Sequence, residues 1–287
     1  MTNAVLVTGA SSGIGAATIG KLDAEGFQVY AGVRKERDFE TILNRSGGSI
    51  RPLILDVTQP ETIEAAVELI GEKEPQGLVG LVNNAGIAVS GPLETIPMDE
   101  VKRQFDVNVF GQLCLTQHVL GQLKKSDAAR IINVSSVSGL LALPMVGPYA
   151  ASKFALEALT DSLRQELRHT SVRVCLIEPG VVETPIWQKS EKDDLEKGRL
   201  VEGLDEVSRE RYLGLMSGVE GMKSQSRPTS AEFVAEVIHD AITARRPKAR
   251  YQIGTDAKLA AGVVRCLPTR WKDSLIRRAI KRGQKAA

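Results

Sequence analysis

The chain has 287 residues, of which 43% are hydrophobic and 25% are charged, with a net charge of +2. This composition is typical of a globular protein and allows one large domain or two small ones. The longest apolar run, residues 139–147, is too short to cross a bilayer, and no charged leader with an apolar core opens the chain. Three scattered cysteines and three scattered histidines form neither a disulfide framework nor a metal-ligand pattern, so we expect a cytoplasmic protein without a metal.

Short runs rich in Val, Ile and Leu recur along the chain, and each is apolar throughout. The runs lie at residues 4–8, 28–33, 50–55, 78–82, 130–134 and 172–177, and a last strand is expected at 250–253. Continuous apolar runs of this length are typical of strands that are buried on both faces of a parallel sheet.

Helical patterns fill the intervals between these runs. They cover residues 14–25, 60–71, 99–124 and 148–169, and a further helix is expected to start at Thr229, where Thr229 and Glu232 form a capping-box pattern. The alternation predicts an α/β fold, a doubly wound parallel sheet of about seven strands with helices on both faces. Residues 1–287 are expected to form a single domain of this type.

The turn after the first expected strand is rich in glycine and reads Thr8-Gly9-Ala10-Ser11-Ser12-Gly13-Ile14-Gly15. Glycines let the backbone approach a ligand closely. The helix that follows offers free N–H groups and a positive potential to a phosphate. Because the turn lies between the first strand and the first helix of an alternating pattern, it predicts a nucleotide phosphate site.

The same turn also contains Gly9-x-Ser11-x-Gly13, which is the pattern of a serine-hydrolase nucleophile elbow. An elbow serine needs an oxyanion-hole loop from an earlier strand, and none precedes residue 4. It also needs a downstream acid followed by a histidine on a loop, whereas the three histidines fall on expected helices. A serine hydrolase using Ser11 therefore remains only a minor alternative.

Three further segments follow the expected carboxyl ends of strands and therefore reach the same edge of the sheet as the glycine turn. They are Leu55-Asp56-Val57, Asn83-Asn84-Ala85-Gly86 and Pro179-Gly180-Val181-Val182-Glu183-Thr184. Asp56 is suited to bond an adenine amino group, and the small residues Ala85 and Gly86 leave room for a ribose. Each segment alone is compatible with a plain turn, but their joint position indicates a nucleotide-binding crevice.

A tyrosine and a lysine four residues apart, Tyr149 and Lys153, fall on the helix expected at 148–169 and share one of its faces. Ser136 stands thirteen residues before the tyrosine. A free tyrosine titrates near a pKa of ~10, and a neighbouring positive charge favours the phenolate, so the pair is suited to proton transfer. Alone the spacing is weak evidence, because a solvent-facing helix position gives the same pattern.

Residues 185–227 interrupt the alternation, because they are highly charged and carry apolar side chains only at intervals. The apolar positions are Ile186, Trp187, Leu195, Leu213, Leu215 and Met216. The pattern indicates amphipathic helices in a substrate-lid insertion over the carboxyl edge of the sheet, where ligands bind in this architecture. A plain surface excursion is the alternative.

Residues 265–287 hold eight Lys or Arg against one Asp, a net charge of +7, so the rest of the chain carries −5. This basic tail can form an amphipathic helix on a membrane surface. It can also be a terminal helix that packs Leu275, Ile276 and Ile280 on the body, and we favour this second interpretation. Nucleic-acid binding has little support, because the body is slightly acidic and lacks interleaved aromatic residues.

Together the motifs make the sequence resemble the short-chain dehydrogenase/reductase family, in its single-domain branch. The motifs are Thr8-Gly-x-x-x-Gly-x-Gly15, Asp56, Asn83-Asn-Ala-Gly86, Asn108, Ser136, Tyr149-x-x-x-Lys153 and Pro179-Gly180…Thr184. They cover residues 4–185 in the family's order and spacing. The resemblance implies a Rossmann fold, a nicotinamide cofactor and an enzyme similar to steroid or retinol dehydrogenases or to ketone reductases.

By this resemblance Tyr149 is the general acid that protonates a carbonyl oxygen in reduction, and the general base in oxidation. Lys153 lowers the pKa of the tyrosine and holds the nicotinamide ribose, while Ser136 polarises the substrate oxygen. Asn108 holds a water that relays protons from Lys153 to solvent. The further cofactor contacts are Gly9, Ser11, Ser12, Gly13, Ile14, Gly15, Arg34, Asp56, Val57, Asn83, Ala85, Gly86, Pro179, Gly180, Val182 and Thr184.

The end of the second expected strand bears on which nicotinamide cofactor is used. An acidic residue there accepts the ribose hydroxyls of NAD, whereas a nearby Arg accommodates the 2′-phosphate of NADP. Val33 occupies the acidic position, Arg34 follows it, and Ser11 can add a hydroxyl. The sequence therefore predicts a preference for NADP(H), with NAD(H) as the alternative if Arg34 stacks on adenine without selecting the phosphate.

The loop after Ser136 is apolar over residues 139–145, and Ile186, Trp187 and Met216 are expected to close over it. An apolar pocket with few polar anchors suits a hydrophobic ketone, aldehyde or secondary alcohol. The sequence therefore predicts a small hydrophobic carbonyl or alcohol substrate.

Two expectations concern the rest of the protein's biology. By resemblance the chain forms a homodimer or homotetramer through the helices at 99–124 and 148–169.

A non-catalytic, nucleotide-sensing protein on the same fold is the alternative function, since a fold does not fix an activity. Such a protein would be expected to have lost Ser136, Tyr149 or Lys153, and all three are present.

Overall fold

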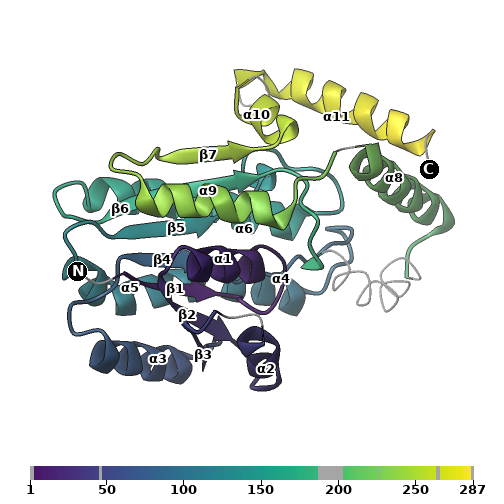
Figure 1. The fold of residues 1–287 in the computed structure, drawn as a ribbon. Coiled ribbons are helices and arrows are strands. Elements are labelled where there is room, and N and C mark those ends of the chain that lie inside the picture. Colours follow the sequence, from purple (N-terminus) through teal and green to yellow (C-terminus); the bar gives the residue numbers. More distant parts are fainter. Residues whose placement is uncertain (1–2, 45–46, 187–202, 226, 263–265, 286–287) are drawn as a thin grey trace.

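The centre of the molecule is a seven-stranded sheet in which all neighbouring strands are parallel (Figure 1). The computed structural model describes residues 3–44, 47–186, 203–225, 227–262 and 266–285. The strands are β1 (Ala4–Thr8), β2 (Gln28–Val33), β3 (Ile50–Ile54), β4 (Gly80–Asn83), β5 (Arg130–Val134), β6 (Arg173–Pro179) and β7 (Arg250–Ile253). Each strand predicted from the sequence is confirmed within two residues at either end.

The strand order is β3-β2-β1-β4-β5-β6-β7. From β1 the chain adds β2 and β3 on one side, then crosses back and adds β4 to β7 on the other side. The connections therefore diverge at the carboxyl ends of β1 and β4, which is where ligands bind in open α/β sheets. The predicted doubly wound, Rossmann-type fold is confirmed.

Helices cover both faces of the sheet (Figure 1). They are α1 (Gly13–Ala24), α2 (Arg37–Leu43), α3 (Pro60–Lys73), α4 (Met98–Phe105), α5 (Gly111–Lys124), α6 (Gly147–Glu166), α8 (Glu206–Gln225), α9 (Ala231–Thr243), α10 (Thr255–Gly262) and α11 (Thr269–Gln284). In β1, Val5 and Val7 join the core under α1 and α9, whereas Ala4 and Leu6 join the core under α3 and α5. Because successive side chains point to opposite faces and both faces are covered, the strand reads as a continuous apolar run.

The helix predicted over residues 99–124 is present but not uniform. It consists of α4, a π-helical turn (Asp106–Phe110) and α5. The sequence does not predict α2 or α10, because helices of seven and eight residues are too short to show a helical period.

The capping box predicted at Thr229 is wrong by one residue. The cap of α9 is Ser230, whose side chain accepts a hydrogen bond from the backbone N–H of Phe233 at 3.1 Å. Thr229 instead lies in an extended segment before the helix, and its backbone N–H donates to the carbonyl of Val181 at 2.9 Å. The backbone of Thr229 therefore ties the loop after β6 to the start of α9.

The insertion and the basic tail are only partly as expected. In the insertion, Trp187 and Leu195 lie outside the described residues, and the described part contains α8, which packs against α11. The expected helix of the tail is confirmed as α11, with Ile280 buried and Ile276 half-buried. The expected packing of Leu275 on the body is wrong, because this side chain is exposed.

Within the described ranges, no helix combines the length and apolarity needed to span a membrane.

Candidate active site

The glycine turn after β1 packs tightly against the start of α1. Gly9 and Gly13 have φ angles of +64° and +55°, in the left-handed region that favours glycine. A Cβ on Gly15 would overlap the carbonyl oxygen of Gly9 and lie 2.6 Å from the side-chain nitrogen of Asn84. Only glycine at position 15 therefore permits this turn, which presents the first backbone N–H groups of α1 at the carboxyl edge of the sheet.

Thr8 and Asn84 hold the turn in place. The Asn84 side-chain amide donates to the carbonyl oxygens of Thr8 at 2.9 Å and Gly9 at 3.2 Å. The Thr8 hydroxyl accepts from the backbone N–H groups of Asn84 at 3.0 Å and Ala85 at 2.9 Å. The loop of Ala85 and Gly86 is thereby fixed beside the glycine turn, where the sequence predicts a ribose.

Asn83 does not take the place that the sequence predicts for it. Its side chain is buried and donates to the Thr116 hydroxyl at 2.9 Å and to the Asn133 side-chain oxygen at 2.8 Å. These bonds join β4 to β5 and α5 in the interior. The side chain that supports the glycine turn is the next one, Asn84, for which the sequence predicts no separate role.

The other predicted cofactor residues gather at the same edge. Ser11, Ser12 and Ile14 lie half-buried on the glycine turn, and Asp56 and Val57 follow β3. One carboxylate oxygen of Asp56 accepts from the backbone N–H and the hydroxyl of Thr58, at 3.0 and 2.8 Å. Asp56 therefore shapes its own turn at the end of β3.

The segment after β6 crosses to the glycine turn. A Cβ on Gly13 would lie 3.1 Å from the Cβ of Thr184, so the two loops are adjacent. Pro179 ends β6, and a Cβ on Gly180 would overlap the Asp256 carboxylate, which itself accepts from the Val181 backbone N–H at 2.9 Å. Val182, half-buried, pairs with the extended Thr229 segment.

The end of β2 has the features expected for NADP(H). Val33 is the last residue of the strand, and Arg34 follows it as an exposed side chain. Val33 therefore stands where an NAD site has its ribose-binding carboxylate, and the nearest charged side chain is the guanidinium of Arg34.

The structure brings Ser136, Tyr149 and Lys153 together in the interior. They are 8%, 6% and 4% exposed, so the alternative of a solvent-facing helix position is wrong. Lys153 Nζ donates to the carbonyl of Val134 at 2.8 Å and lies 5.8 Å from the centre of the Tyr149 ring. Tyr149 hydrogen-bonds to the Ser136 side chain. Tyr149 and Lys153 lie in α6, and Ser136 precedes a short 3₁₀ turn after β5.

Burial dominates the titration of this group. It raises the pKa of Tyr149 above 10.0, and the Ser136 hydrogen bond acts in the opposite direction. Burial also lowers the pKa of Lys153 to about 8, against the effect of the Glu157 charge, which raises it. The sequence predicts that Lys153 lowers the tyrosine pKa, but here the loss of solvation is the larger effect. The phenol therefore keeps its proton at neutral pH, as a general acid requires.

Asn108 lies fully buried in the π-helical turn between α4 and α5. Its side chain accepts from the Ile87 N–H at 2.9 Å and donates to the Ile87 carbonyl at 3.0 Å and to Ser152 Oγ at 3.2 Å. The Ser152 hydroxyl donates to the Tyr149 carbonyl at 2.7 Å. Asn108 thus couples the loop after β4 to the first turn of α6. Ser152 is a further positioning residue, for which the sequence carries no signal.

Comparisons with known proteins identify the family of this chain. A family model described as short chain dehydrogenase matches residues 3–195. The chain belongs to the short chain dehydrogenase family. This membership favours an oxidoreductase over a serine hydrolase that uses Ser11.

Relatives of both expected kinds are found in this short chain dehydrogenase family. The chain is 34% identical over 290 residues to the NADPH-dependent 3-dehydrocapnine reductase of Ornithobacterium rhinotracheale, covering 96% of this chain and 97% of the relative. It is 33% identical over 281 residues to retinol dehydrogenase 7 of Rattus norvegicus, covering 95% and 87%. Among solved structures, a short-chain dehydrogenase from Streptomyces avermitilis has a TM-score of 0.76 at 25% identity, covering 99% and 97%. The protein is an oxidoreductase of this family.

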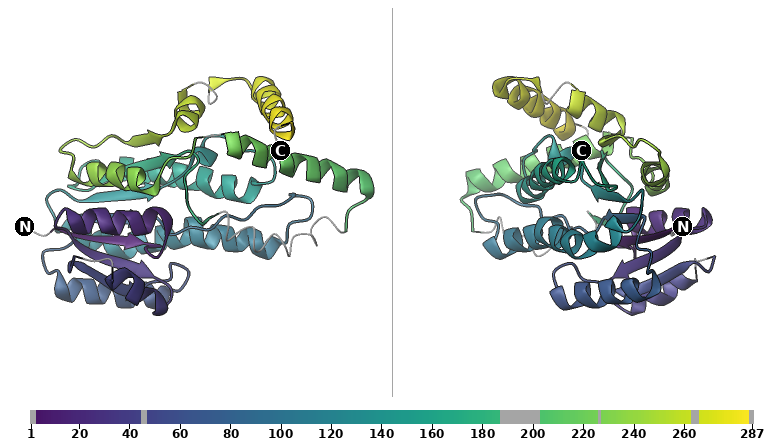
Figure 2. Two further views of the ribbon diagram at one scale, coloured as in Figure 1. Left: turned by 45° about the vertical axis from the view of Figure 1, so that its right-hand side comes forward. Right: turned by 90° about the vertical axis from the view of Figure 1, so that its left-hand side faces the viewer.

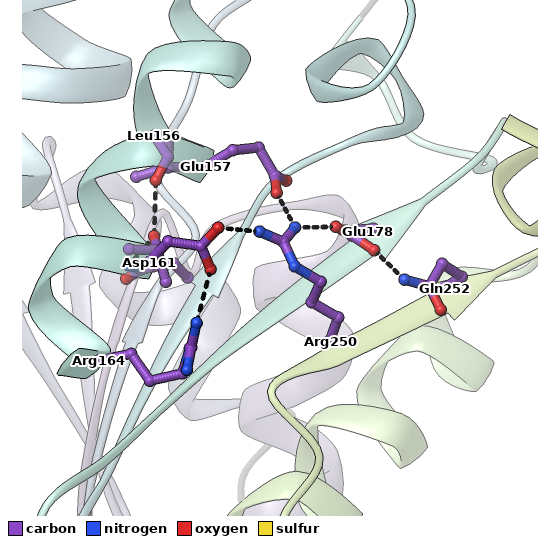
Figure 3. A network of polar contacts seen from close by, with 9 residues as sticks. Leu156, Glu157, Asp161, Arg164, Glu178, Arg250 and Gln252 are labelled. Atoms are coloured by element: carbon purple, nitrogen blue, oxygen red, sulfur yellow. Dashed lines mark hydrogen bonds and ion pairs between the residues drawn. The ribbon is translucent and has the colours of Figure 1, made fainter. Parts of the chain in front are cut away.

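One ionic network of this short chain dehydrogenase is centred on Arg250 (Figure 3). The Arg250 guanidinium pairs with Glu178 and Asp161, each at 2.5 Å, and with Glu157. Gln252 donates to the other oxygen of Glu178, which is fully buried. The network ties α6 to β6 and β7, and it fixes Glu157 one helical turn after Lys153.

Replacing Arg250 by Met is expected to lower the free energy of unfolding by about 3 kcal/mol, because Glu157 and Glu178 would remain buried without their cation. Urea unfolding at pH 7 measures this loss. Burial already raises the pKa of Glu157 above 4.5, so protonation at lower pH is expected to recover part of the deficit. Arg173→Met, an exposed arginine on the neighbouring strand β6, is the control. Equal losses in the two variants would show that the network contributes nothing specific.

Proposed function

We propose that the protein is an NADP(H)-dependent oxidoreductase that transfers a hydride between nicotinamide and a hydrophobic ketone, aldehyde or secondary alcohol. The observation that carries the proposal is the buried group of Ser136, Tyr149 and Lys153 at the ligand edge of the sheet. A protonated phenol next to a serine hydroxyl is suited to protonate a carbonyl oxygen, which is the step that a hydride acceptor needs.

The residues at the edge fit a dinucleotide. The close approach of Gly15 to Gly9 leaves no side chain over the first turn of α1, so a pyrophosphate can reach its N–H groups. When bound, the nicotinamide cofactor supplies or accepts the hydride. We assign the 2′-phosphate to Arg34 and Ser11, the adenine to Asp56, and the riboses to Ala85, Gly86 and Lys153. The carboxamide is assigned to Val182 and Thr184.

In reduction, Ser136 binds the substrate oxygen and Tyr149 gives it a proton. Lys153 then helps to restore the proton of the tyrosine, and a water that we assign to Asn108 links Lys153 to solvent. The described bonds of Asn108 to Ile87 and Ser152 support a second task, which is to hold the start of α6 in position. In oxidation the same groups act in reverse.

Replacing Arg34 by Ala is expected to lower kcat/KM for NADPH by about 10- to 100-fold, with kcat/KM for NADH almost unchanged. The reason is the loss of one charge-assisted hydrogen bond to the 2′-phosphate, about 1.5–3 kcal/mol. Steady-state kinetics with each cofactor measure both values. Lys35→Ala, which removes the adjacent exposed charge, is the control. A wild-type enzyme that turns over NADH more efficiently than NADPH would contradict the NADP(H) assignment. The NADPH-dependent relative supports it.

The substrate assignment rests on the loop between Ser136 and α6. It contains Leu140, Leu141, Leu143 and Met145. Met145 has a φ of +69°, and its carbonyl accepts from the Gly91 N–H at 2.7 Å, so the loop is held in a defined and strained shape. The names of the reductase and retinol dehydrogenase relatives support a carbonyl or alcohol substrate.

A substrate panel tests the function as a whole. Purified protein is supplied with NADPH or NADP and with hydrophobic ketones, aldehydes and secondary alcohols, next to polar sugars as controls. Turnover is expected with the hydrophobic members. Tight NADPH binding without turnover of any member would favour the nucleotide-sensing alternative.

The cytoplasmic location, the single domain and the homodimer or homotetramer also remain proposals. Exposed Phe110, which precedes α5, and exposed Phe154 in α6 support association through the predicted helices.

A further inference from the structure

The helix α11 lies at the edge of the molecule, beside α8 and away from the central sheet (Figure 1, Figure 2). Only Ile280 and Gly283 among its residues are buried. The two helices touch through their backbones, since a Cβ on Gly283 would overlap the carbonyl oxygen of Gly218 in α8. One narrow face therefore attaches α11 to the protein, and most of its surface faces outward.

The outward face of α11 combines apolar and cationic side chains. Trp271 is 68% exposed and Leu275 is 46% exposed. Arg278 and Arg282 are also exposed. The spacing of i, i+4, i+7 and i+11 places these four residues on one face of the helix. The favoured interpretation from sequence, in which the apolar residues of the tail pack on the body, thus accounts for Ile280 but not for this face.

The positive charge of α11 is not balanced within the protein. The helix carries six Lys or Arg and one acidic residue, Asp273. In the part of the chain that the structure describes, none of these basic side chains forms an ion pair. Since residues outside 265–287 carry a net charge of −5, the positive potential is concentrated at this one edge.

We propose that α11 docks on a membrane surface rich in anionic phospholipids. Trp271 and Leu275 enter the headgroup region, and the arginines and lysines around them bind lipid phosphates. Tryptophan favours the headgroup level, and each basic side chain near an anionic surface strengthens binding by about fivefold. Nucleic acid is the other polyanion that such a charge attracts, but single-strand binding uses several aromatic side chains in a row, and α11 has one.

Sedimentation with sucrose-loaded vesicles tests the docking without any measurement of activity. The full chain is expected to bind vesicles of phosphatidylcholine with 30% phosphatidylserine and not vesicles of phosphatidylcholine alone, with binding that weakens as salt is raised. The chain has two tryptophans. In a Trp187→Phe variant the fluorescence of Trp271 is therefore isolated, and its emission is expected to shift to the blue on anionic vesicles. No sedimentation at low salt would overturn the proposal.

Two matched double variants distinguish the contribution of α11 to vesicle binding from that of the net charge of the protein. Arg278→Glu with Arg282→Glu is expected to weaken vesicle binding by at least about 20-fold. Arg245→Glu with Arg246→Glu makes the same change of charge at exposed positions after α9 and is expected to retain binding. Equal losses in the two pairs, with melting temperatures unchanged, would show a general charge effect and overturn the assignment to α11. Tighter binding to duplex DNA or RNA than to anionic vesicles would overturn it in favour of nucleic acid.

Discussion

Replacing Tyr149 by Phe is expected to lower kcat by about 10²- to 10⁴-fold, the usual contribution of a positioned general acid. Phenylalanine fills the same buried space but has no proton to give to the substrate oxygen and no hydroxyl to bond Ser136. The cofactor contacts assigned to the glycine turn and to Arg34 are untouched. The dissociation constant for NADPH, measured by fluorescence titration, is therefore expected to stay within about threefold of the wild-type value.

Tyr30→Phe is the matched control for this variant. Tyr30 is also a buried tyrosine, with its hydroxyl 2.8 Å from a carboxylate oxygen of Glu74, but it lies in β2 and takes no assigned part in the site. It is expected to keep wild-type kcat. If Tyr149→Phe retained more than about one tenth of wild-type kcat, the assigned proton donor would be refuted.

The pH profile of the wild-type enzyme is a second readout of the same group. Burial raises the pKa of Tyr149, so the protonated form persists above the ordinary value of 10.0. Reduction is therefore not expected to lose its proton donor between pH 6 and about 9. Oxidation needs the phenolate, so its rate is expected to rise with pH over the same interval. The opposite result would be a reduction rate that falls near neutral pH in the wild type, with no such pH dependence in the residual activity of Tyr149→Phe. It would show that the bound cofactor reverses the effect of burial on the pKa of Tyr149.

Replacing Gly15 by Ala is expected to weaken NADPH binding by at least about 100-fold, the scale of loss that a displacement of about 1 Å can cause. The added Cβ would overlap the Gly9 carbonyl oxygen and lie 2.6 Å from Asn84 Nδ2. Because the first contact is backbone, either the glycine turn or α1 must move, and the phosphate-binding N–H groups move with it. Isothermal titration with NADPH measures the affinity, and thermal unfolding measures the accompanying loss of stability.

Gly20→Ala provides the control on the same helix. A Cβ on Gly20 has nothing within 4 Å, and its position is exposed. Alanine is a better helix former than glycine by about 1 kcal/mol, so this variant is expected to be slightly more stable and to bind NADPH normally. Normal NADPH affinity in Gly15→Ala would show that the turn is not the phosphate site.

The parts of the fold and site that could be predicted depend on local patterns. Strands buried on both faces read as apolar runs, so β1 to β7 were visible in the sequence. Tyr149 and Lys153 share a helix face through their spacing alone. Their burial and the resulting pKa shifts could not be predicted, because these depend on the packing of β5 and the loop after it around α6.

The separate roles of Asn83 and Asn84 could not be predicted, because the side chains of these sequence neighbours point in opposite directions. Asn83 and Asn84 are identical in type, but Asn83 is the last residue of β4 and points into the interior, whereas Asn84 lies beyond the strand and faces the glycine turn. A shift of one residue in the predicted strand end exchanges their roles. Arg250 was missed for a different reason, since its partner Glu157 is 93 residues away and is brought near only by the pairing of β6 with β7.

The strand order has a consequence for how the sheet can form while the chain is being synthesised. Each strand pairs with one that has already been synthesised: β2 with β1, β3 with β2, β4 with β1, and then β5, β6 and β7 each with the strand before it. No strand has to be inserted between two that have already joined, so the sheet can grow at its edges as the chain leaves the ribosome. The cofactor residues that we propose between Gly9 and Gly86 are then translated before Ser136, Tyr149 and Lys153, the residues that we propose for catalysis.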